Sequence, residues 1–110
     1  MPLSWDEFRR VDMRVGEVID VEDFPEARNP SYRLRIDFGS LGVKTASAAV
    51  RPWYSKDALR GRRVIAVVNF PPKQIANFLS EVLVLGAVQP DGRVVLLRPD
   101  DGGELGSQIA

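Results

Sequence analysis

The stretch from Val64 to Ala87 constrains the fold more than any other part of the chain. It places two apolar strand candidates, Val64–Phe70 and Glu81–Gly86, on either side of a polar insert that runs from Pro71 to Ser80. Proline has no backbone N–H and cannot continue a sheet ladder, so the Pro-Pro pair ends the first strand. The insert carries one cation, two amides and an aromatic ring, which is typical of a functional loop held by two rigid strands.

The rest of the chain predicts further strands and two short helices. Ser4 and Glu7 fit a capping box for a helix that ends near Arg9, and Ser55 fits the N-cap of a helix within residues 52–60. Apolar alternation and turn residues predict four more strand segments, one of them with a bulge or a bend at Gly16, where the alternation changes phase. These segments are 12–24, 32–38, 43–50 and, after an Asp-Gly turn, 94–97; Ile109 is expected to add a short terminal strand.

The order of these elements predicts the fold class. Three strands, a helix and then two or more strands are the order of the five-stranded OB-fold barrel, in which the helix lies between strands three and four. We therefore expect an all-β barrel with a short N-terminal helix. The length of 110 residues is that of one domain, so residues 1–110 are expected to form a single unit.

Composition argues against catalysis and metal binding. The chain contains no cysteine and no histidine, which excludes a disulfide scaffold, a thiolate site and the usual general base at neutral pH. The adjacent carboxylates Glu22-Asp23 and Asp100-Asp101 would point apart and are expected to be solvated. We expect no enzymatic activity, no metal and no cofactor. No apolar run is long enough to span a membrane and residues 1–10 do not resemble a signal peptide, so we expect a cytoplasmic protein.

The net charge is zero, but the charges are unevenly distributed. Residues 1–30 carry eight acidic and four basic side chains, residues 31–75 carry two and nine, and residues 76–110 carry five and two. The net charges of these three segments are therefore −4, +7 and −3. A basic middle segment is typical of a nucleic-acid footprint, but solvated outer faces of strands and a helix would give the same pattern.

Candidate ligand-binding residues gather in strands two and three and in the 71–80 insert, regions that bind oligonucleotides in OB folds. Cations there could contact phosphates, amides and hydroxyls could donate or accept hydrogen bonds, and the two phenylalanines could stack bases or hold apolar peptide side chains. The small residues of strand three would let another surface approach closely, or would serve a tightly curved strand. The candidates are Arg33, Arg35, Lys44, Ser47, Phe70, Lys73, Gln74, Asn77, Phe78 and Ser80.

The ends of the chain carry apolar side chains that a small barrel cannot cover. Trp5 and Phe8 lie three residues apart and share one face of the first helix, and Leu105 and Ile109 lie in the polar tail. A two-fold interface would bury the same patch on both subunits, so these four residues predict a homodimer.

Four segments of the chain closely resemble CsaA, a family of bacterial protein-export chaperones within the tRNA-binding-domain family. They are residues 11–16, 24–28, 32–39 and 68–86, and the resemblance extends from about Phe8 to Pro99. It implies an OB barrel, a homodimer, no enzymatic activity, and two ligand classes, namely unfolded or pre-export polypeptides and tRNA. Lys73, Asn77 and Ser80 fall in the block that matches the family's binding loop, whereas Ala46 departs from a more polar family pattern.

Three functions are compatible with the sequence. A polypeptide-binding chaperone is favoured by the near-zero net charge and by the closer resemblance to CsaA than to the related domains appended to some methionyl- and phenylalanyl-tRNA synthetases. A tRNA-binding module is favoured by the basic middle segment, because phosphate contacts dominate such affinity. The third function is an assembly module that only dimerises.

Overall fold

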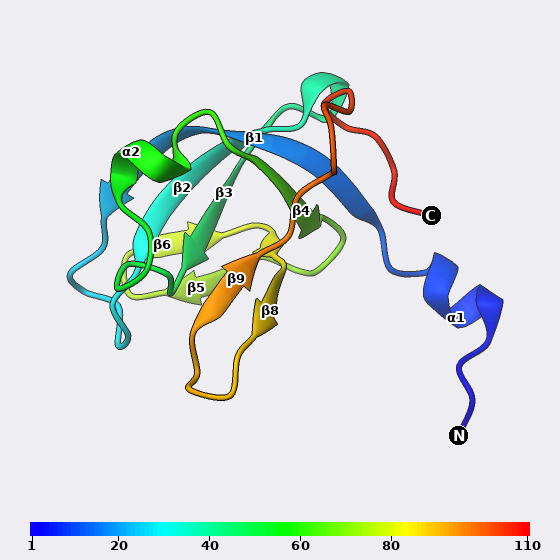
Figure 1. Cartoon of the computed structure of the whole chain (residues 1–110), viewed down its shortest axis with the longest axis horizontal. Coiled ribbons are helices and arrows are strands. Elements are labelled where there is room, and N and C mark those ends of the chain that lie inside the picture. The colour runs from blue at the N-terminus through cyan, green and yellow to red at the C-terminus, as the bar shows by residue number, and fades with distance from the viewer.

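Five antiparallel strands curl into a barrel in the computed structural model, which describes all residues from Met1 to Ala110 (Figure 1). Their order in the sheet is β3-β2-β1-β4-β7. Two small hairpins, β5–β6 and β8–β9, form separate two-stranded sheets. This architecture confirms the all-β OB fold. The strands are β1 Met13–Asp23, β2 Tyr32–Asp37, β3 Val43–Ala48, β4 Arg63–Val67, β5 Lys73–Ile75, β6 Phe78–Ser80, β7 Leu83–Val84, β8 Gly86–Val88 and β9 Val94–Leu96.

The barrel core is built from the inward faces of these strands. Alternation along β2 buries Tyr32, Leu34 and Ile36 and turns Arg33 and Arg35 to the other face, as the sequence pattern predicts. The largest fully buried side chains come from β1, β2 and β4, from the residue after β2 and from the helix that precedes β4: Phe38, Leu34, Ile36, Leu59, Val18 and Val64.

The bulge of β1 does not lie at Gly16, where the sequence predicted a bulge or a bend. The register with β2 shifts between Val18 and Asp20, which leaves Ile19 without a partner. Gly16 has a different role, since a Cβ there would lie 2.5 Å from Ile36 Cγ2 and 2.7 Å from a ring carbon of Phe38. A side chain at this position would overlap two core residues, and the sheet can curl tightly only because glycine has none.

The helix α1 (Trp5–Arg9) begins with the predicted capping box. The Ser4 hydroxyl oxygen accepts from the Glu7 N–H at 3.1 Å, and the Glu7 carboxylate accepts from the Ser4 N–H at 2.9 Å. The hydrogen bond that the Ser4 backbone N–H donates to the carboxylate, together with the nearby Ser4 hydroxyl, lowers the pKa of the Glu7 carboxyl. α1 buries none of its residues and extends away from the barrel (Figure 1).

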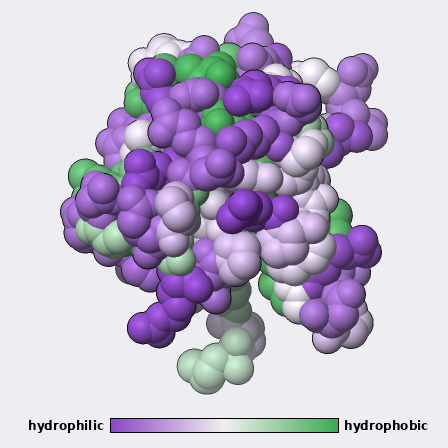
Figure 2. All heavy atoms as spheres, turned by 90° about the vertical axis from the view of Figure 1, so that its left-hand side faces the viewer, coloured by the Kyte–Doolittle hydropathy of each residue, from purple (hydrophilic) through white to green (hydrophobic).

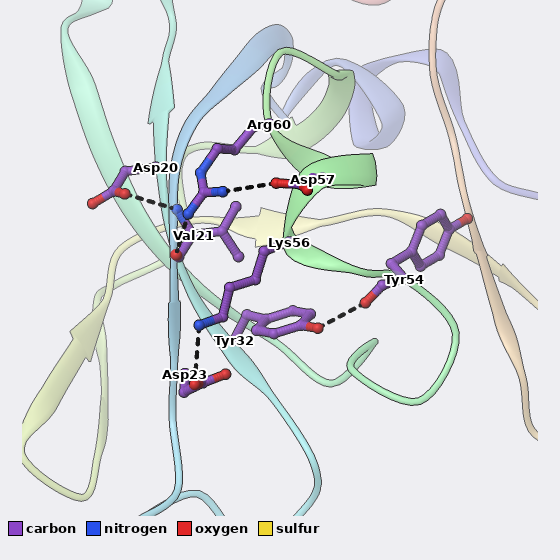
Figure 3. A network of polar contacts seen from close by, with 8 residues as sticks. All are labelled: Asp20, Val21, Asp23, Tyr32, Tyr54, Lys56, Asp57 and Arg60. Carbon is purple, nitrogen blue, oxygen red and sulfur yellow. Dashed lines mark hydrogen bonds and ion pairs between the residues drawn. The ribbon is translucent and has the colours of Figure 1, made fainter.

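The second helix, α2 (Lys56–Leu59), lies between β3 and β4 and is capped by Ser55 as predicted. It is shorter than the predicted 52–60, because residues 51–53 form a turn in which the N–H groups of Trp53 and Tyr54 both donate to Val50 O. Polar contacts hold α2 and this turn against β1 and β2 (Figure 3). Lys56 Nζ lies 3.0 Å from Asp23 Oδ2, and this contact lowers the pKa of the Asp23 carboxyl. Tyr32 donates its hydroxyl to Tyr54 O at 2.8 Å.

The C-terminal tail returns along the first half of β1. Val15 N–H donates to Ser107 O, Ile109 N–H donates to Met13 O, and Arg14 and Gln108 form an isolated bridge. The predicted terminal strand is therefore a single bridge beside β1. A 3₁₀ turn, η1 (Gly39–Leu41), lies under this tail. Neither helix is long or apolar enough to cross a membrane.

Candidate functional site

The predicted 71–80 loop is a β-hairpin that packs beside β3. Its strands β5 and β6 pair from Lys73–Ser80 to Ile75–Phe78, and Gln74 Nε2 donates to Ala76 O at 2.8 Å across the turn. Ala76 adopts a φ of 51°, the left-handed conformation that a turn this tight needs. The strand before the hairpin was predicted to extend to Phe70 but ends at Val67. After it, Val68 and Asn69 form hydrogen bonds with Arg10 and Asp12, in the segment that precedes β1.

The hairpin is joined to β3 through side chains as well as backbone. The N–H groups of Glu81 and Val82 both donate to Thr45 O, at 2.8 and 3.2 Å. In return Thr45 N–H donates to the Glu81 carboxylate, at 3.0 Å, and Ser47 N–H donates to Ser80 Oγ, also at 3.0 Å. Two side chains thus replace part of the ladder that would close the barrel at this seam. Ser80, a predicted ligand residue, already accepts a hydrogen bond within the chain.

Arg33 fixes the other end of the hairpin. Its guanidinium lies 4.5 Å from the Phe24 ring centroid and 5.5 Å from that of Phe78, and the two rings meet edge to face. It also donates to Asn77 Oδ1 at 2.9 Å and lies 3.4 Å from the Glu26 carboxylate. The sequence predicted that Arg33, Asn77 and Phe78 would bind a ligand. In the structure these three residues attach the hairpin tip to the β1–β2 loop.

A cavity of about 440 Å³ opens between the β1–β2 loop, the end of β3 and the outer strand of the hairpin. Its volume is within the usual range of ligand-binding clefts. The lining is mixed, with two cations, two amides, two hydroxyls and three small or apolar side chains. The residues are Ala27, Arg28, Asn29, Ser31, Ser47, Ala49, Lys73, Gln74 and Ile75.

A smaller cavity of about 150 Å³ lies on the other side of Lys73. Its wall is formed by Phe70, Lys73 and residues 80–83. Phe70 leaves 53% of its surface exposed. Lys73 lines both cavities, so one cation serves two adjoining hollows. Phe70 and Phe78, which the sequence placed in one groove, are separated: Phe70 is open to a ligand and Phe78 packs against Phe24 and Arg33.

The free positive charges of the site differ from those that the sequence suggested. Arg28, Arg35 and Lys73 are exposed and take part in none of the six ion pairs of the chain. Lys44 pairs with Ile36 across the sheet and shares the face of β3 that carries Ala46 and Ala48 in the core. The structure therefore brings Lys73 and Arg28 together at one cavity and separates Lys44 from Arg33 and Arg35.

Six cavity residues were missed by the sequence reasoning: Ala27, Arg28, Asn29, Ser31, Ala49 and Ile75. The first four lie between β1 and β2, Ala49 follows a strand of small residues, and Ile75 ends β5. No local pattern distinguishes the first five, because they reach the cavity through the pairing of β1, β2 and β3. The face formed by α2, the β1–β2 loop and the hairpin tip is largely hydrophilic, with smaller apolar patches (Figure 2).

The residues predicted for dimerisation lie apart from this site. Trp5, Phe8 and Ile109 line an apolar hollow of about 330 Å³ between α1 and the C-terminal tail. Trp5 leaves 78% of its surface exposed. Leu105 is half-buried, and its backbone packs against Gly39 of η1. No part of this chain covers the open side of α1.

Comparison with known proteins places this site in context. Residues 13–108 match the family described as "Putative tRNA binding domain". The methionine–tRNA ligase of Nanoarchaeum equitans is 37% identical over 108 residues, which are 97% of this chain and 13% of the ligase. That of Pyrococcus abyssi is 36% identical over 110 residues, 15% of its length. The chain thus spans only about a seventh of these relatives.

Three solved structures match the chain over 99% or 100% of its length, and each of the three is itself covered completely. The CsaA chaperone protein from Picrophilus torridus has a TM-score of 0.93 and 54% identity, with 99% of this chain and 100% of that chain covered. The CsaA chaperone from Bacillus anthracis has a TM-score of 0.94 and 46% identity, with full coverage of both chains. A MetRS-related protein from Pyrococcus horikoshii has a TM-score of 0.88 at 27% identity.

Proposed function

Since the chain belongs to the tRNA-binding-domain family, we propose that it acts as a CsaA-type chaperone, a cytoplasmic homodimer that binds unfolded or pre-export polypeptides and catalyses no reaction. The observation that carries this proposal is the match to the CsaA chaperones in both extent and identity. The chain covers both of them from end to end at 54% and 46% identity, whereas it covers only a small part of the ligases and is only 27% identical to the MetRS-related protein, which it also covers completely.

The two adjoining cavities support a polypeptide ligand. The larger one offers hydrogen-bonding and charged groups, and the smaller one offers the exposed ring of Phe70. A polypeptide presents both kinds of group within a few residues, so an extended segment that crosses Lys73 would use both cavities. Two such sites in a dimer would strengthen weak binding to a long unfolded chain, because the second contact becomes intramolecular.

A second candidate function, tRNA binding, is favoured by the family and by the charges of the site. Arg28, Arg35 and Lys73 are free of internal ion pairs and could contact phosphates. Three such contacts on single-stranded RNA correspond to a slope of log affinity against log salt of roughly −2 for each protomer.

Titration of both ligands at low and high salt tests the proposal. The probes are a permanently unfolded chain, reduced and carboxymethylated lactalbumin, and labelled unfractionated tRNA. We expect the affinity for the polypeptide to change little with salt. We expect Phe70→Ala to weaken this binding by about 1–3 kcal/mol, because an apolar contact is lost. Lys44→Ala serves as the control variant, since Lys44 lies on the other face of β3.

The outcomes separate the two functions. If tRNA binds with a steep salt dependence that Lys73→Ala makes shallower, and the unfolded chain does not bind, the chaperone proposal is wrong. Salt-insensitive binding of the unfolded chain without tRNA binding removes the nucleic-acid alternative.

A further inference from the structure

The exposed edge of β3 carries backbone groups that no part of this chain uses. We propose that an extended polypeptide segment pairs with this edge at Ser47–Ala49, so that main-chain hydrogen bonds to β3 hold the client in the larger cavity. This inference rests on the proposed chaperone function and adds the mode of binding to it.

The direction of these groups follows from the register. β3 pairs with β2 alone among the strands, and along such a strand the N–H and C=O of one residue point to the same side. Thr45 and Ser47 direct their N–H groups away from β2, toward Glu81 and Ser80. The carbonyl of Ser47 therefore also points to the outer edge. Ala49 directly follows β3, and the alternation of burial continues through it, since Ala48 and Val50 are buried and Ala49 is exposed.

The seam with the hairpin leaves two of these groups free. Ser80 Oγ takes the N–H of Ser47, but no side chain donates to the Ser47 carbonyl. The N–H of Ala49 makes no hydrogen bond within the chain. The free carbonyl and the free N–H flank Ala48, the spacing at which one residue of a parallel strand donates to the first and accepts from the second.

The free edge opens into a cavity of suitable size and composition. Ser47 and Ala49 both line the hollow of about 440 Å³, and the opposite wall is formed by Lys73, Gln74 and Asn29. The hairpin stops short of covering the edge because Arg33 holds its tip against the β1–β2 loop. A strand edge left uncovered beside a preformed cavity is a template for an added strand.

Main-chain pairing suits a polypeptide better than RNA. Every extended peptide repeats the same N–H and C=O groups, so the edge can bind clients of unrelated sequence, with side-chain contacts from the cavity walls. An RNA backbone has no N–H groups, and its 2′-hydroxyls do not repeat the alternating donor and acceptor pattern that the edge presents. The alternation of small residues in β3 also keeps the edge accessible, since neither Ser47 nor Ala49 carries a bulky side chain.

Replacement of the free N–H is the direct test. Ala49→Pro removes this donor without breaking any hydrogen bond of the chain, and Ala49→Val adds bulk but keeps the N–H. With reduced, carboxymethylated lactalbumin as the probe, we expect Ala49→Pro to weaken binding about tenfold and Ala49→Val to change it less than twofold. In the unmodified protein, saturation with the probe should slow hydrogen exchange at the Ala49 amide at least tenfold.

Each outcome decides a different question. Equal binding by the unmodified protein and both variants, with unchanged exchange at Ala49, would overturn edge pairing and leave the chaperone function intact. A loss of tRNA affinity in Ala49→Pro with polypeptide binding unchanged would assign the edge to RNA and also overturn it. No binding of the probe by the unmodified protein would refute the chaperone function itself. If Ala49→Pro does not fold, the exchange measurement on the unmodified protein decides alone.

Discussion

Arg33 shows how one side chain can organise a site without facing the ligand. Its guanidinium contacts two aromatic rings, donates to the Asn77 amide oxygen and pairs with the Glu26 carboxylate, while its Nε is buried without a hydrogen-bond acceptor. The contacts come from the β1–β2 loop and from the hairpin tip, so Arg33 sets the width of the cavity between them. Arg35, two residues later on the same face of β2, has none of these contacts and is exposed.

Substitution at these two positions should therefore have different effects. We expect Arg33→Ala to lower the free energy of unfolding by about 1–3 kcal/mol and to speed hydrogen exchange throughout residues 73–80, because two cation–π contacts and a hydrogen bond are lost. Arg35→Ala is the matched control and should change stability by less than about 0.5 kcal/mol. Denaturant unfolding and exchange monitored by mass spectrometry measure both, and equal effects of the two variants would contradict the positioning role.

At the scale of elements, the seam between β3 and the hairpin decides how far the barrel closes. The carbonyl of Thr45 accepts two backbone hydrogen bonds on this side, and the N–H of Ser47 donates to a serine hydroxyl. The N–H of Ala49 has no partner. The closure therefore weakens along β3 toward the cavity. An edge with such a gradient can keep the barrel folded at one end and offer backbone groups to a ligand at the other.

The hydroxyl of Ser80 contributes a single side-chain hydrogen bond to this seam, the one that it accepts from the N–H of Ser47. We expect Ser80→Ala to lower the free energy of unfolding by about 1–2 kcal/mol, because the N–H of Ser47 is left without its acceptor, and to speed exchange of that amide. Ser80→Thr keeps an Oγ and should preserve most of the stability. Thermal unfolding and amide exchange by NMR provide the comparison. An unchanged Ser47 amide in Ser80→Ala would show that this hydrogen bond does not hold the seam.

For the whole molecule, the main consequence concerns the dimer. α1 extends from the barrel and buries none of its own residues, while Trp5 and Phe8 face an apolar hollow that the C-terminal tail completes. A helix of five residues is not stable alone in water, so its order requires a partner surface beyond its capping box. In our proposal a second copy of the chain supplies that surface. α1 lies at the opposite end of the molecule from α2 (Figure 1).

If the chain forms the proposed dimer through α1, substitutions of its two tryptophans should have different effects on association. We expect sedimentation equilibrium to give a dimer at micromolar concentration and Trp5→Ala to weaken association at least tenfold, because hot-spot residues of interfaces are often tryptophans. Trp53 is also partly exposed but precedes α2, so Trp53→Ala is the matched control and should leave the dimer intact. A monomeric unmodified protein at this concentration would disprove the dimer.

The sequence by itself determined the features that depend on neighbouring residues. The capping box of Ser4 and Glu7, the N-cap at Ser55, the alternation of β2 and the turn at Asp91-Gly92 all follow from local geometry, and the structure contains each of them. Their order along the chain was enough to predict the OB barrel, because few folds accommodate it.

Only the tertiary structure decided which side chains meet at the site. In β3, Lys44-Thr45-Ala46-Ser47 offers little contrast between apolar and polar positions, so alternation alone could not show that Lys44 lies on the core side. The contact of Arg33 with Phe78 and the hydrogen bond between Ser47 and Ser80 each join residues at least 33 positions apart in the sequence. Phe24, which also contacts Arg33, lies closer in the sequence. Such contacts depend on strand register and barrel closure, which arise from the packing of the whole chain rather than from any one segment.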